Sequence, residues 1–258
     1  MSVQSVKKAF SILSMFSAAQ THFGITEIGK SLGLTNPTVH GLVKTLVEIG
    51  YLEQDSSTKK YKLSANIYEL GHHYLGSSRV FQTGARATHR LSQKTKLNAR
   101  LAVRNGDSII VILDIYPNAE KFQFHQVGPR LPSYCTSLGK AILSLLSPEE
   151  LAEYLKQTPL IAYTQRTITD GKQLLADLKK GQSQGFVIDQ EESTPGAVCV
   201  GAPILDSNSI PIAAVSISSG PELLKLQNFP ELVDELMQTA TEISFALGYN
   251  RTLTPIGG

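Results

Sequence analysis

Apolar positions recur at helical spacing near the start of the chain and predict two helices before residue 34. Val6, Phe10 and Leu13 follow the i, i+4, i+7 pattern of the buried face of an amphipathic helix. A short second helix is expected next, because Thr26 can cap its start and Gly33 can end it in the left-handed conformation. A tight turn then leads into a further helical segment.

A third helix is expected from Pro37 to Ile49. Asn36 is a good N-cap, and proline suits the first turn because its missing N–H would be unpaired there anyway. Apolar side chains form the predicted buried face: Val39, Leu42, Val43, Leu46 and Val47. Small or polar side chains face outward: Thr38, His40, Gly41, Lys44 and Thr45. Two helices joined by a tight turn predict a helix-turn-helix, whose second helix can enter the major groove of DNA.

Two short β-rich segments, 51–54 and 61–63, follow this motif and are joined by the polar loop 55–60. Such a hairpin is a wing, and Lys59 and Lys60 at the end of its loop can neutralise DNA phosphates. We therefore expect residues 1–63 to form a winged helix-turn-helix domain. The side chains expected to contact double-stranded operator DNA are Asn36, Thr38, His40, Lys44, Thr45, Lys59 and Lys60.

The alternative for this region is a small helical protein-interaction domain whose lysines only solvate its surface. Residues 1–63 contain seven lysines against four acidic residues, although the net charge of the whole chain is only +2. A positive first quarter joined to a nearly neutral remainder is typical of a nucleic-acid module attached to a partner domain. The charge distribution therefore favours DNA binding.

The rest of the chain predicts a linker helix within residues 64–79 and a second domain over residues 80–258. Helices are expected at 80–95, 137–146, 148–157, 170–184 and 230–247, and strands at 97–103, 108–114, 122–124, 186–189, 197–205 and 210–218. Strands and helices that mix without regular alternation predict an α+β domain with a central antiparallel sheet. If the last hairpin is symmetric, Cys199 lies opposite Ser216, and Ser218 shares their side of the sheet as part of a pocket wall.

Composition excludes several classes of protein. A chain of 258 residues with 41% hydrophobic and 18% charged residues is typical of a soluble protein of one or two domains. Its longest aliphatic run, 109–113, is far shorter than the ~20 residues that span a bilayer. The start of the chain resembles a signal peptide superficially, but serines recur every three residues in its apolar stretch. This spacing favours an amphipathic helix and a cytoplasmic protein.

The residues also argue against an enzyme and against a metal or other cofactor. Neither Cys135 nor Cys199 has a companion at ligand spacing, and the two cysteines cannot form a multi-thiolate zinc site. The adjacent His72 and His73 point about 100° apart on a helix and cannot chelate together. A redox sensor remains an alternative, since two thiols are the minimum for a switch.

Several motifs occur in a specific order and spacing over almost the whole chain. In the N-terminal part they are residues 6–13, Gly33-Leu34-Thr35, Thr38-Val39-His40, residues 46–52 and Lys60-Tyr61-Lys62-Leu63. In the C-terminal part they are Leu138-Gly139-Lys140-Ala141, Gly185-Phe186, Asp189-Gln190-Glu191-Glu192, residues 196–203 and residues 213–218. Together these motifs resemble the IclR family of bacterial transcriptional regulators.

The resemblance implies a winged helix-turn-helix joined by a linker helix to a GAF-like effector domain, in a homodimer or a dimer of dimers. Members of the family bind small organic acids, often aromatic or keto acids, and repress or activate a catabolic operon. The positions that match the family's effector contacts are Ser137, Leu138, Asp189, Ala197, Cys199, Ser216 and Ser218. A small carboxylic acid effector is therefore expected.

N–H groups at the start of the helix at Ser137 and the two serine hydroxyls can hold a carboxylate. Asp189 would repel an anion, so we expect it to accept a hydrogen bond from a ligand hydroxyl or a backbone N–H. The chain departs from the family at Pro37 and Gly41, where a basic residue is usual. Phosphate contacts are therefore expected to shift to Lys44 and the wing.

Overall fold

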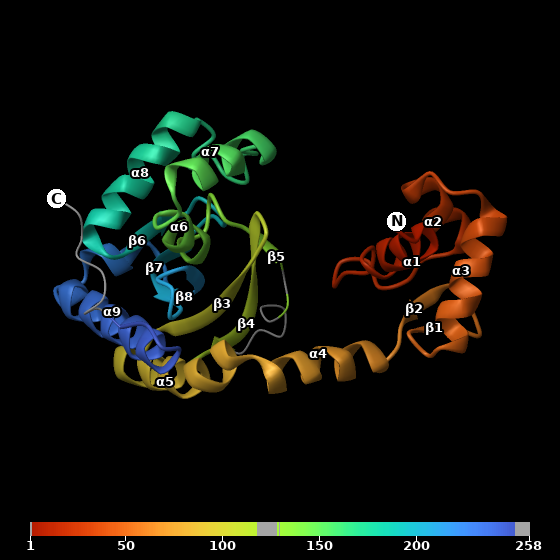
Figure 1. Ribbon diagram of the computed structural model, residues 1–258, viewed down its shortest axis with the longest axis horizontal. Coiled ribbons are helices and arrows are strands. Elements are labelled where there is room, and N and C mark those ends of the chain that lie inside the picture. Colours follow the sequence, from red (N-terminus) through yellow and green to blue (C-terminus); the bar gives the residue numbers. More distant parts are fainter. Residues whose placement is uncertain (1, 118–127, 129, 251–258) are drawn as a thin grey trace. The chain divides into compact units, whose positions relative to one another are not determined.

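The computed structural model describes residues 2–117, 128 and 130–250, which form two compact units that divide between Ser77 and Ser78 (Figure 1). The strand expected at 122–124 lies outside the described residues. The N-terminal unit contains α1 (Gln4–Leu13), α2 (Ile25–Leu32), α3 (Asn36–Glu48), β1 (Leu52–Gln54), β2 (Tyr61–Leu63) and α4 (Asn66–Ser77).

The core of the N-terminal unit forms where α1, α2 and α3 meet. Its fully buried side chains include Ile12, Ile28, Val39 and Val43. The buried face predicted for α1 is wrong, because Val6 and Phe10 are 52% and 60% exposed. Leu13 is partly buried as predicted, and α1 packs through Ala9, Ile12 and Leu13, with Phe16 after its end in the same core. On α3, Val47 was expected to be buried but is exposed, and Leu42 is only partly buried.

The helix boundaries of the helix-turn-helix differ slightly from the expected ones. Helix α2 starts after Gly24, whose N–H donates to Glu27 Oε2 at 2.6 Å, so Thr26 is not the cap. Gly33 ends α2 in the left-handed conformation, with φ of 64°, as predicted. Helix α3 begins one residue early, because the extended Thr35 is its N-cap and Asn36 lies in the first turn.

The wing is a short antiparallel hairpin in which Leu52 pairs with Leu63. Its loop is held by Asp55, whose Oδ1 accepts hydrogen bonds from the backbone N–H groups of Ser57 and Thr58 at 3.1 and 2.7 Å. Lys59 follows with a positive φ of 60°. The loop therefore has a defined shape that presents Lys59 at its surface.

The C-terminal unit is built on a six-stranded antiparallel sheet in the order β5-β4-β3-β8-β7-β6. The strands are β3 (Asn98–Asn105), β4 (Ser108–Ile115), β5 (Arg130–Pro132), β6 (Val187–Gln190), β7 (Val198–Leu205) and β8 (Pro211–Ser219). The helices are α5 (Arg79–Thr95), α6 (Ser137–Leu143), α7 (Pro148–Gln157), α8 (Gly171–Gln184), a 3-10 helix (Pro221–Lys225) and α9 (Phe229–Ala246). The predicted α+β fold with a central antiparallel sheet is confirmed.

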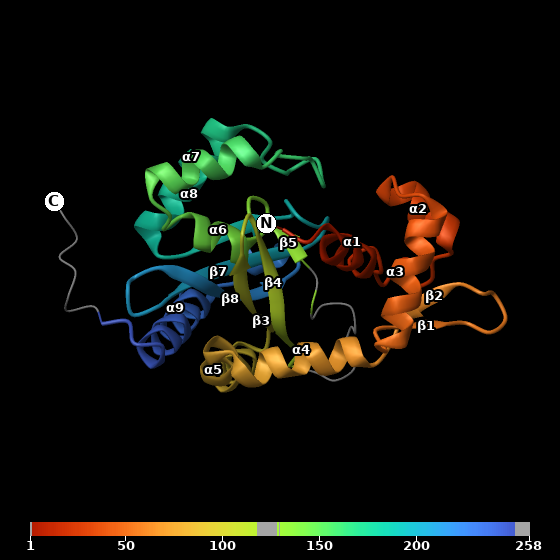
Figure 2. The same cartoon turned by 45° about the vertical axis from the view of Figure 1, so that its right-hand side comes forward.

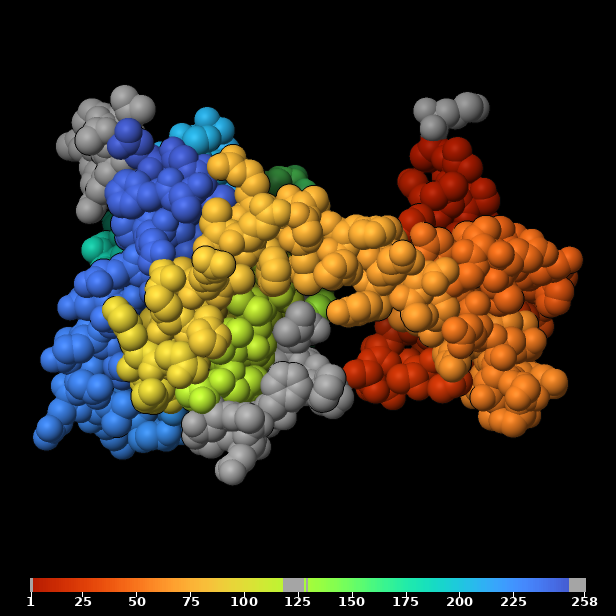
Figure 3. Space-filling model, turned by 90° about the horizontal axis from the view of Figure 1, so that it is seen from below, coloured from red at the N-terminus to blue at the C-terminus, as the bar shows by residue number. Residues whose placement is uncertain are grey.

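Helices cover both faces of this sheet. Helices α5 and α9 pack on one face, and α6 packs on the other with α8 outside it (Figure 2). In the view from below, residues of α5 (yellow) and α9 (blue) form the surface over their face (Figure 3). The core beneath α6 includes Leu138, Ala141 and Ile142 of the helix and Ala102 and Ala214 of the central strands. A site between α6 and the sheet is therefore enclosed by secondary structure.

The register of the last hairpin differs from the symmetric one. Cys199 pairs with Ser218, and Ser216 pairs with Gly201. The ladder shifts at a bulge between Ile204 and Leu205, and the turn is closed by Asp206, whose N–H donates to the Ile210 carbonyl at 3.0 Å. Because the shift is two residues, Ser216, Ser218 and Cys199 still share one face of the sheet.

Candidate nucleic-acid interface and ligand cavity

The outer side of α3 presents the polar side chains expected to contact DNA. Thr38, His40, Lys44 and Thr45 are all exposed. Two hydroxyls already have partners, since Thr45 Oγ1 donates to the Gly41 carbonyl at 3.1 Å and Thr38 Oγ1 lies 2.9 Å from Thr35 Oγ1. Lys44 Nζ lies 3.8 Å from the Glu48 carboxylate, and both side chains are well exposed. Such surface pairs are weak, so the charge of Lys44 remains available to a phosphate.

The remaining predicted DNA contacts differ in their surroundings. Asn36 is exposed at the start of α3, but its side chain lies close to Gly29 of α2. A Cβ added at Gly29 would be 3.1 Å from Asn36 Oδ1. Lys60 Nζ donates to Glu27 Oε1 at 2.8 Å, which attaches the wing to α2 and lowers the pKa of Glu27. Lys59 is exposed. Of the two wing lysines, Lys59 is therefore the one better placed for a phosphate.

A cavity of about 280 Å³ lies between α6 and the sheet of the C-terminal unit. Five of the seven residues expected to contact an effector line it: Ser137, Leu138, Asp189, Cys199 and Ser216. The other two, Ala197 and Ser218, line a hollow of about 410 Å³. The two spaces share Arg100, Ser193, Thr194 and Cys199, so they adjoin. The structure therefore brings all seven predicted residues into one region.

Arg100 was missed by sequence reasoning although it lines both spaces. It lies on β3 opposite Asp114 on one side and Ser216 on the other. Its Nε lies 3.2 Å from Asp114 Oδ1, and the arginine side chain is 19% exposed. A signal was present, because Arg100 is the one charged residue in the β-rich run 97–103. An arginine on the inner face of a strand needs a buried partner or a ligand.

Asp189 is buried and both of its oxygens have partners. Oδ1 accepts the backbone N–H of Glu192 and Oδ2 accepts the Ser193 hydroxyl, each at 2.7 Å. Burial raises the pKa of Asp189, and these hydrogen bonds oppose the rise. Of the two roles expected for Asp189, the backbone contact is the one present. Its carboxylate shapes the loop that carries Ser193 and Thr194 into the cavity wall.

A buried lysine holds the same loop from behind. Lys140 of α6 is fully buried, and its Nζ donates to Asp177 Oδ2, the Ile188 carbonyl and Glu192 Oε1 at 2.8, 2.7 and 2.5 Å. Burial raises the pKa of Glu192 to about 7, although Lys140 lowers it. Thr167 Oγ1 donates to the Glu192 carbonyl at 2.6 Å. This cluster fixes the end of β6 against α6 and α8.

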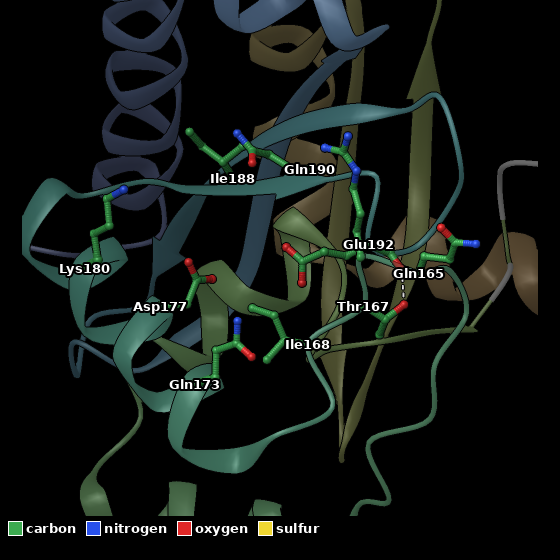
Figure 4. Close-up of a pocket in the computed structure, with 10 residues that line it drawn as sticks. Gln165, Thr167, Ile168, Gln173, Asp177, Lys180, Ile188, Gln190 and Glu192 are labelled. Carbon is green, nitrogen blue, oxygen red and sulfur yellow. Dashed lines mark hydrogen bonds between the residues drawn. The ribbon is translucent and has the colours of Figure 1, made fainter.

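Figure 4 shows the outer side of this cluster, where Asp177 and Glu192 border a polar pocket of about 550 Å³. Three glutamines, Gln165, Gln173 and Gln190, also line it. Glu192 Oε2 is buried and has no hydrogen-bond partner among the described residues. None of the residues that line this pocket is one of the expected effector contacts.

The two cysteines both line the cavity, as neutral thiols. Burial raises the pKa of Cys135 and of Cys199 to about 12. The thiolate is the reactive form, so little of it exists at neutral pH. This disfavours the redox-sensor alternative. Within the described ranges, the structure shows no cluster of three or more His, Cys, Asp or Glu side chains that could hold a metal.

An exposed recognition helix with a wing and a separate α+β unit with an enclosed cavity define a two-domain DNA-binding regulator. The chain matches the family model for the bacterial transcriptional regulator IclR C-terminal domain over residues 72–245, and that for the IclR helix-turn-helix domain over residues 5–56. It therefore belongs to the IclR family of bacterial transcriptional regulators, which confirms the resemblance and the regulatory function.

Individual relatives extend over nearly the full length. The chain is 32% identical over 250 residues to the HTH-type transcriptional regulator XynR of Escherichia coli, covering 96% of this chain and 98% of the relative. The crystal structure of the Thermotoga maritima IclR aligns with a TM-score of 0.72 at 28% identity, over 95% of this chain and 99% of the other. An IclR homolog from Microbacterium hydrocarbonoxydans complexed with 4-hydroxybenzoate aligns with a TM-score of 0.78 at 24% identity, over 94% of this chain and 98% of the other.

Proposed function

We propose that this regulator binds operator DNA in the cytoplasm through α3 and the wing, and that a small organic acid in the C-terminal cavity modulates this binding. The observation that carries the proposal is the gathering of the seven expected effector positions around two adjoining spaces on one side of the sheet. A ligand that binds one arrangement of the regulator better than another shifts the population between DNA-competent and incompetent forms. The proposal involves no enzymatic step and no cofactor.

For the DNA contacts, the exposure of the polar side chains on α3 supports a role in the major groove. Thr38 and His40 are assigned to base edges, together with Asn36 and Thr45, and Lys44, Lys59 and Lys60 to phosphates. Two copies would place their α3 helices in successive major grooves, with half-sites ~10 bp or a multiple apart. The operator is then a palindrome.

A homodimer or a dimer of dimers is supported by apolar side chains that the N-terminal unit exposes. Val3 is 63% exposed, and Val6 and Phe10 follow it on one side of α1 at 52% and 60%. Tyr68, Leu70 and Tyr74 of α4 are also exposed, and none of the residues of this described helix is buried. Exposed apolar side chains gathered on one helix indicate an interaction surface. We therefore assign residues 64–79 as a linker that also contributes to association.

For the effector, the cavity of about 280 Å³ is near the lower end of the usual range for ligand pockets, which suits a small molecule. The relative complexed with 4-hydroxybenzoate, an aromatic carboxylate, supports an acid as the ligand class. Ser216 and Ser218 can donate hydroxyl hydrogens to such a ligand. The hydroxyl of Ser218 donates to Asn98 Oδ1 at 2.8 Å, so the ligand has to compete with that bond.

The test is fluorescence anisotropy of the full-length protein with a duplex from its own upstream region, from 50 to 200 mM salt. We expect affinity that falls with salt and exceeds the affinity for a scrambled duplex. Addition of benzoate, pyruvate or gluconate should change the affinity, and the double variant Ser216→Ala, Ser218→Ala should lose this response. Ser183→Ala on the exposed surface of α8 is the matched control. Salt-insensitive or sequence-independent binding contradicts the proposal.

A further inference from the structure

The charged groups of the cavity are few, and they are arranged asymmetrically. Of the described residues that line it, Arg100 is the only cation and Asp189 the only carboxylate. Both oxygens of Asp189 accept hydrogen bonds from the loop 192–193. The negative charge of the wall is therefore turned toward the loop, and the positive charge lies where the cavity meets the adjoining hollow.

Arg100 is held in place but incompletely satisfied. Asp114 is almost fully buried and is fixed by Asn98, whose Nδ2 donates to Oδ1 at 2.6 Å. Arg100 Nε lies 3.2 Å from the same oxygen, yet this buried nitrogen makes no hydrogen bond within the described part of the chain. Arg100 also hydrogen-bonds the Tyr116 hydroxyl. A guanidinium has five donors in a rigid fork, so these two partners leave part of its capacity for a ligand.

The guanidinium extends from Asp114 toward the residues expected to contact the effector. Ser216 is its cross-strand neighbour on β8, and the positive charge of Arg100 lies near enough to Cys199 on β7 to lower the pKa of that thiol against the effect of burial. A carboxylate at the junction would therefore meet Arg100 and Ser216 together. Arginine binds carboxylates through two parallel hydrogen bonds, which are strong where water is excluded.

The two spaces that meet at Arg100 differ in character. The cavity has an apolar side formed by Val111, Leu131, Pro132, Leu138 and Tyr163, and its other lining residues are mostly polar. The adjoining hollow has polar side chains, including Lys96, Asn98, Ser218 and Ser219. Apolar walls favour a compact ring or short branched chain over a polyhydroxy acid, whose hydroxyls would lose their hydrogen bonds to water.

We propose that Arg100 is the residue that recognises the effector's carboxylate, and that the cavity and hollow form one site for a compact aromatic monocarboxylate. The ring occupies the enclosed cavity, the carboxylate lies against Arg100 at the junction, and the hollow is the polar entrance. This inference rests on the proposed function and deepens it by naming a specificity-determining residue. In the structure, the carboxylate that pairs with Arg100 is that of Asp114.

The experiment is isothermal titration of the full-length protein with benzoate and with benzamide, its neutral isostere. Wild type should prefer benzoate, and Arg100→Gln should lose about tenfold to a hundredfold in benzoate affinity while benzamide binding changes little. Arg104→Gln is the matched control, because Arg104 lies on the same strand but lines neither space. Its Nη1 lies 3.6 Å from Glu150 Oε1. A purely structural role for Arg100 would weaken both ligands alike, and that result overturns the proposal.

A second variant, for which benzoate affinity is expected to rise, tests the proposal if Arg100→Gln does not fold. Asp114→Asn removes the competing carboxylate, so benzoate affinity should rise while benzamide affinity stays the same. A fall in benzoate affinity overturns the proposal. Preference for gluconate over benzoate in the wild type overturns the aromatic assignment.

The outcomes also separate this inference from the function on which it rests. Benzoate binding that depends on Arg100 without salt-sensitive DNA binding contradicts the proposed function and supports the role of Arg100. Salt-sensitive DNA binding without any benzoate binding overturns the inference and leaves DNA recognition standing.

Discussion

The two units present their functional side chains in opposite ways. In the N-terminal unit, the side chains expected to contact DNA are exposed except for the half-buried Lys60, and most of them come from α3 alone. In the C-terminal unit, the side chains around the cavity come from all six strands of the described sheet, from α6 and from the loops beside them, and Asp189 and Ser216 are almost fully buried. A surface for a large ligand needs only one well-presented helix, whereas an enclosed site depends on the register of the whole sheet.

The charges of the two units differ in the same way. Lys44 is exposed and lies 3.8 Å from an exposed glutamate, so its ion pair contributes little to stability. Lys140 is fully buried among two carboxylates and a carbonyl. Removing one partner of a buried cluster leaves uncompensated charge in a medium that solvates it poorly. Lys44 is therefore available to a partner such as a phosphate, while the charge of Lys140 is used within the fold.

Replacing the buried lysine should have the largest effect. Lys140→Met should lower the free energy of unfolding of the C-terminal unit by about 3–5 kcal/mol, because Glu192 and Asp177 lose their shared cation. Lys44→Met in the N-terminal unit should change stability by less than about 0.5 kcal/mol. Urea denaturation followed by circular dichroism measures both. Equal effects would remove the distinction between the two kinds of charge.

Stability should also depend on pH through Glu192. Its pKa is raised from 4.5 to about 7 in the folded protein, so between these pH values the folded state binds more protons than the unfolded state. Its contribution to stability is therefore present at low pH and is lost as pH rises through this window, by at most about 3 kcal/mol. Urea midpoints from pH 4.5 to 7.5 test this, with Glu192→Gln as the variant that should flatten the profile. A wild-type slope of the opposite sign contradicts the assignment.

The close packing of α6 gives a further contrast. A Cβ at Gly139 would lie 2.2 Å from Ser133 Cα, so Gly139→Ala should force α6 away from the neighbouring backbone and cost about 1–3 kcal/mol. Because α6 forms one wall of the cavity, the same variant should weaken benzoate binding. Thermal unfolding and titration calorimetry measure the two effects. Unchanged stability would show that the backbone at Ser133 can shift to accommodate the added Cβ at little cost.

How much the sequence could predict follows from the same contrast. The outward residues of α3 and the pairing of the wing depend on local spacing, and they are found as expected. The face of α1 was predicted wrongly because Val6 and Phe10 have the helical period but lie on the exposed side. Local periodicity identifies an amphipathic helix, but it does not distinguish a core face from a face that is left for a partner.

In the C-terminal unit, most helices and strands could be predicted to within a few residues, but the register could not. The symmetric pairing of Cys199 with Ser216 failed by two residues. The turn closes with Asp206 opposite Ile210, which shifts the pairing by one residue, and the bulge at Ile204 and Leu205 shifts it by one more. Arg100 was missed because its position beside the cavity depends on pairing with Asp114 and Ser216, which lie on other strands. Non-local pairing carries this information, and a single sequence does not display it.

On the DNA side, smaller effects should separate base contacts from phosphate contacts. Lys44→Ala should weaken binding to all duplexes alike and lower the salt slope by about one. Thr38→Ala or His40→Ala should relax the preference at one base pair, by about 1–3 kcal/mol of discrimination. Anisotropy with a set of single-base operator variants at two salt concentrations measures both. Equal loss of discrimination in all three variants would refute this division.

The smallest effects are expected at Gly41, which is exposed on α3 and where an added Cβ would meet no described atom within 4 Å beyond its chain neighbours and the local helix backbone. Gly41→Ala should stabilise the N-terminal unit by about 1 kcal/mol through helix propensity, with no change in the salt slope. Gly41→Lys should raise the salt slope by about one, because it adds a cation to the outer side of α3. Urea denaturation and anisotropy measure the two quantities. An unchanged salt slope for Gly41→Lys would mean that this part of α3 does not approach the DNA backbone, and the recognition surface would then have to be moved toward the wing.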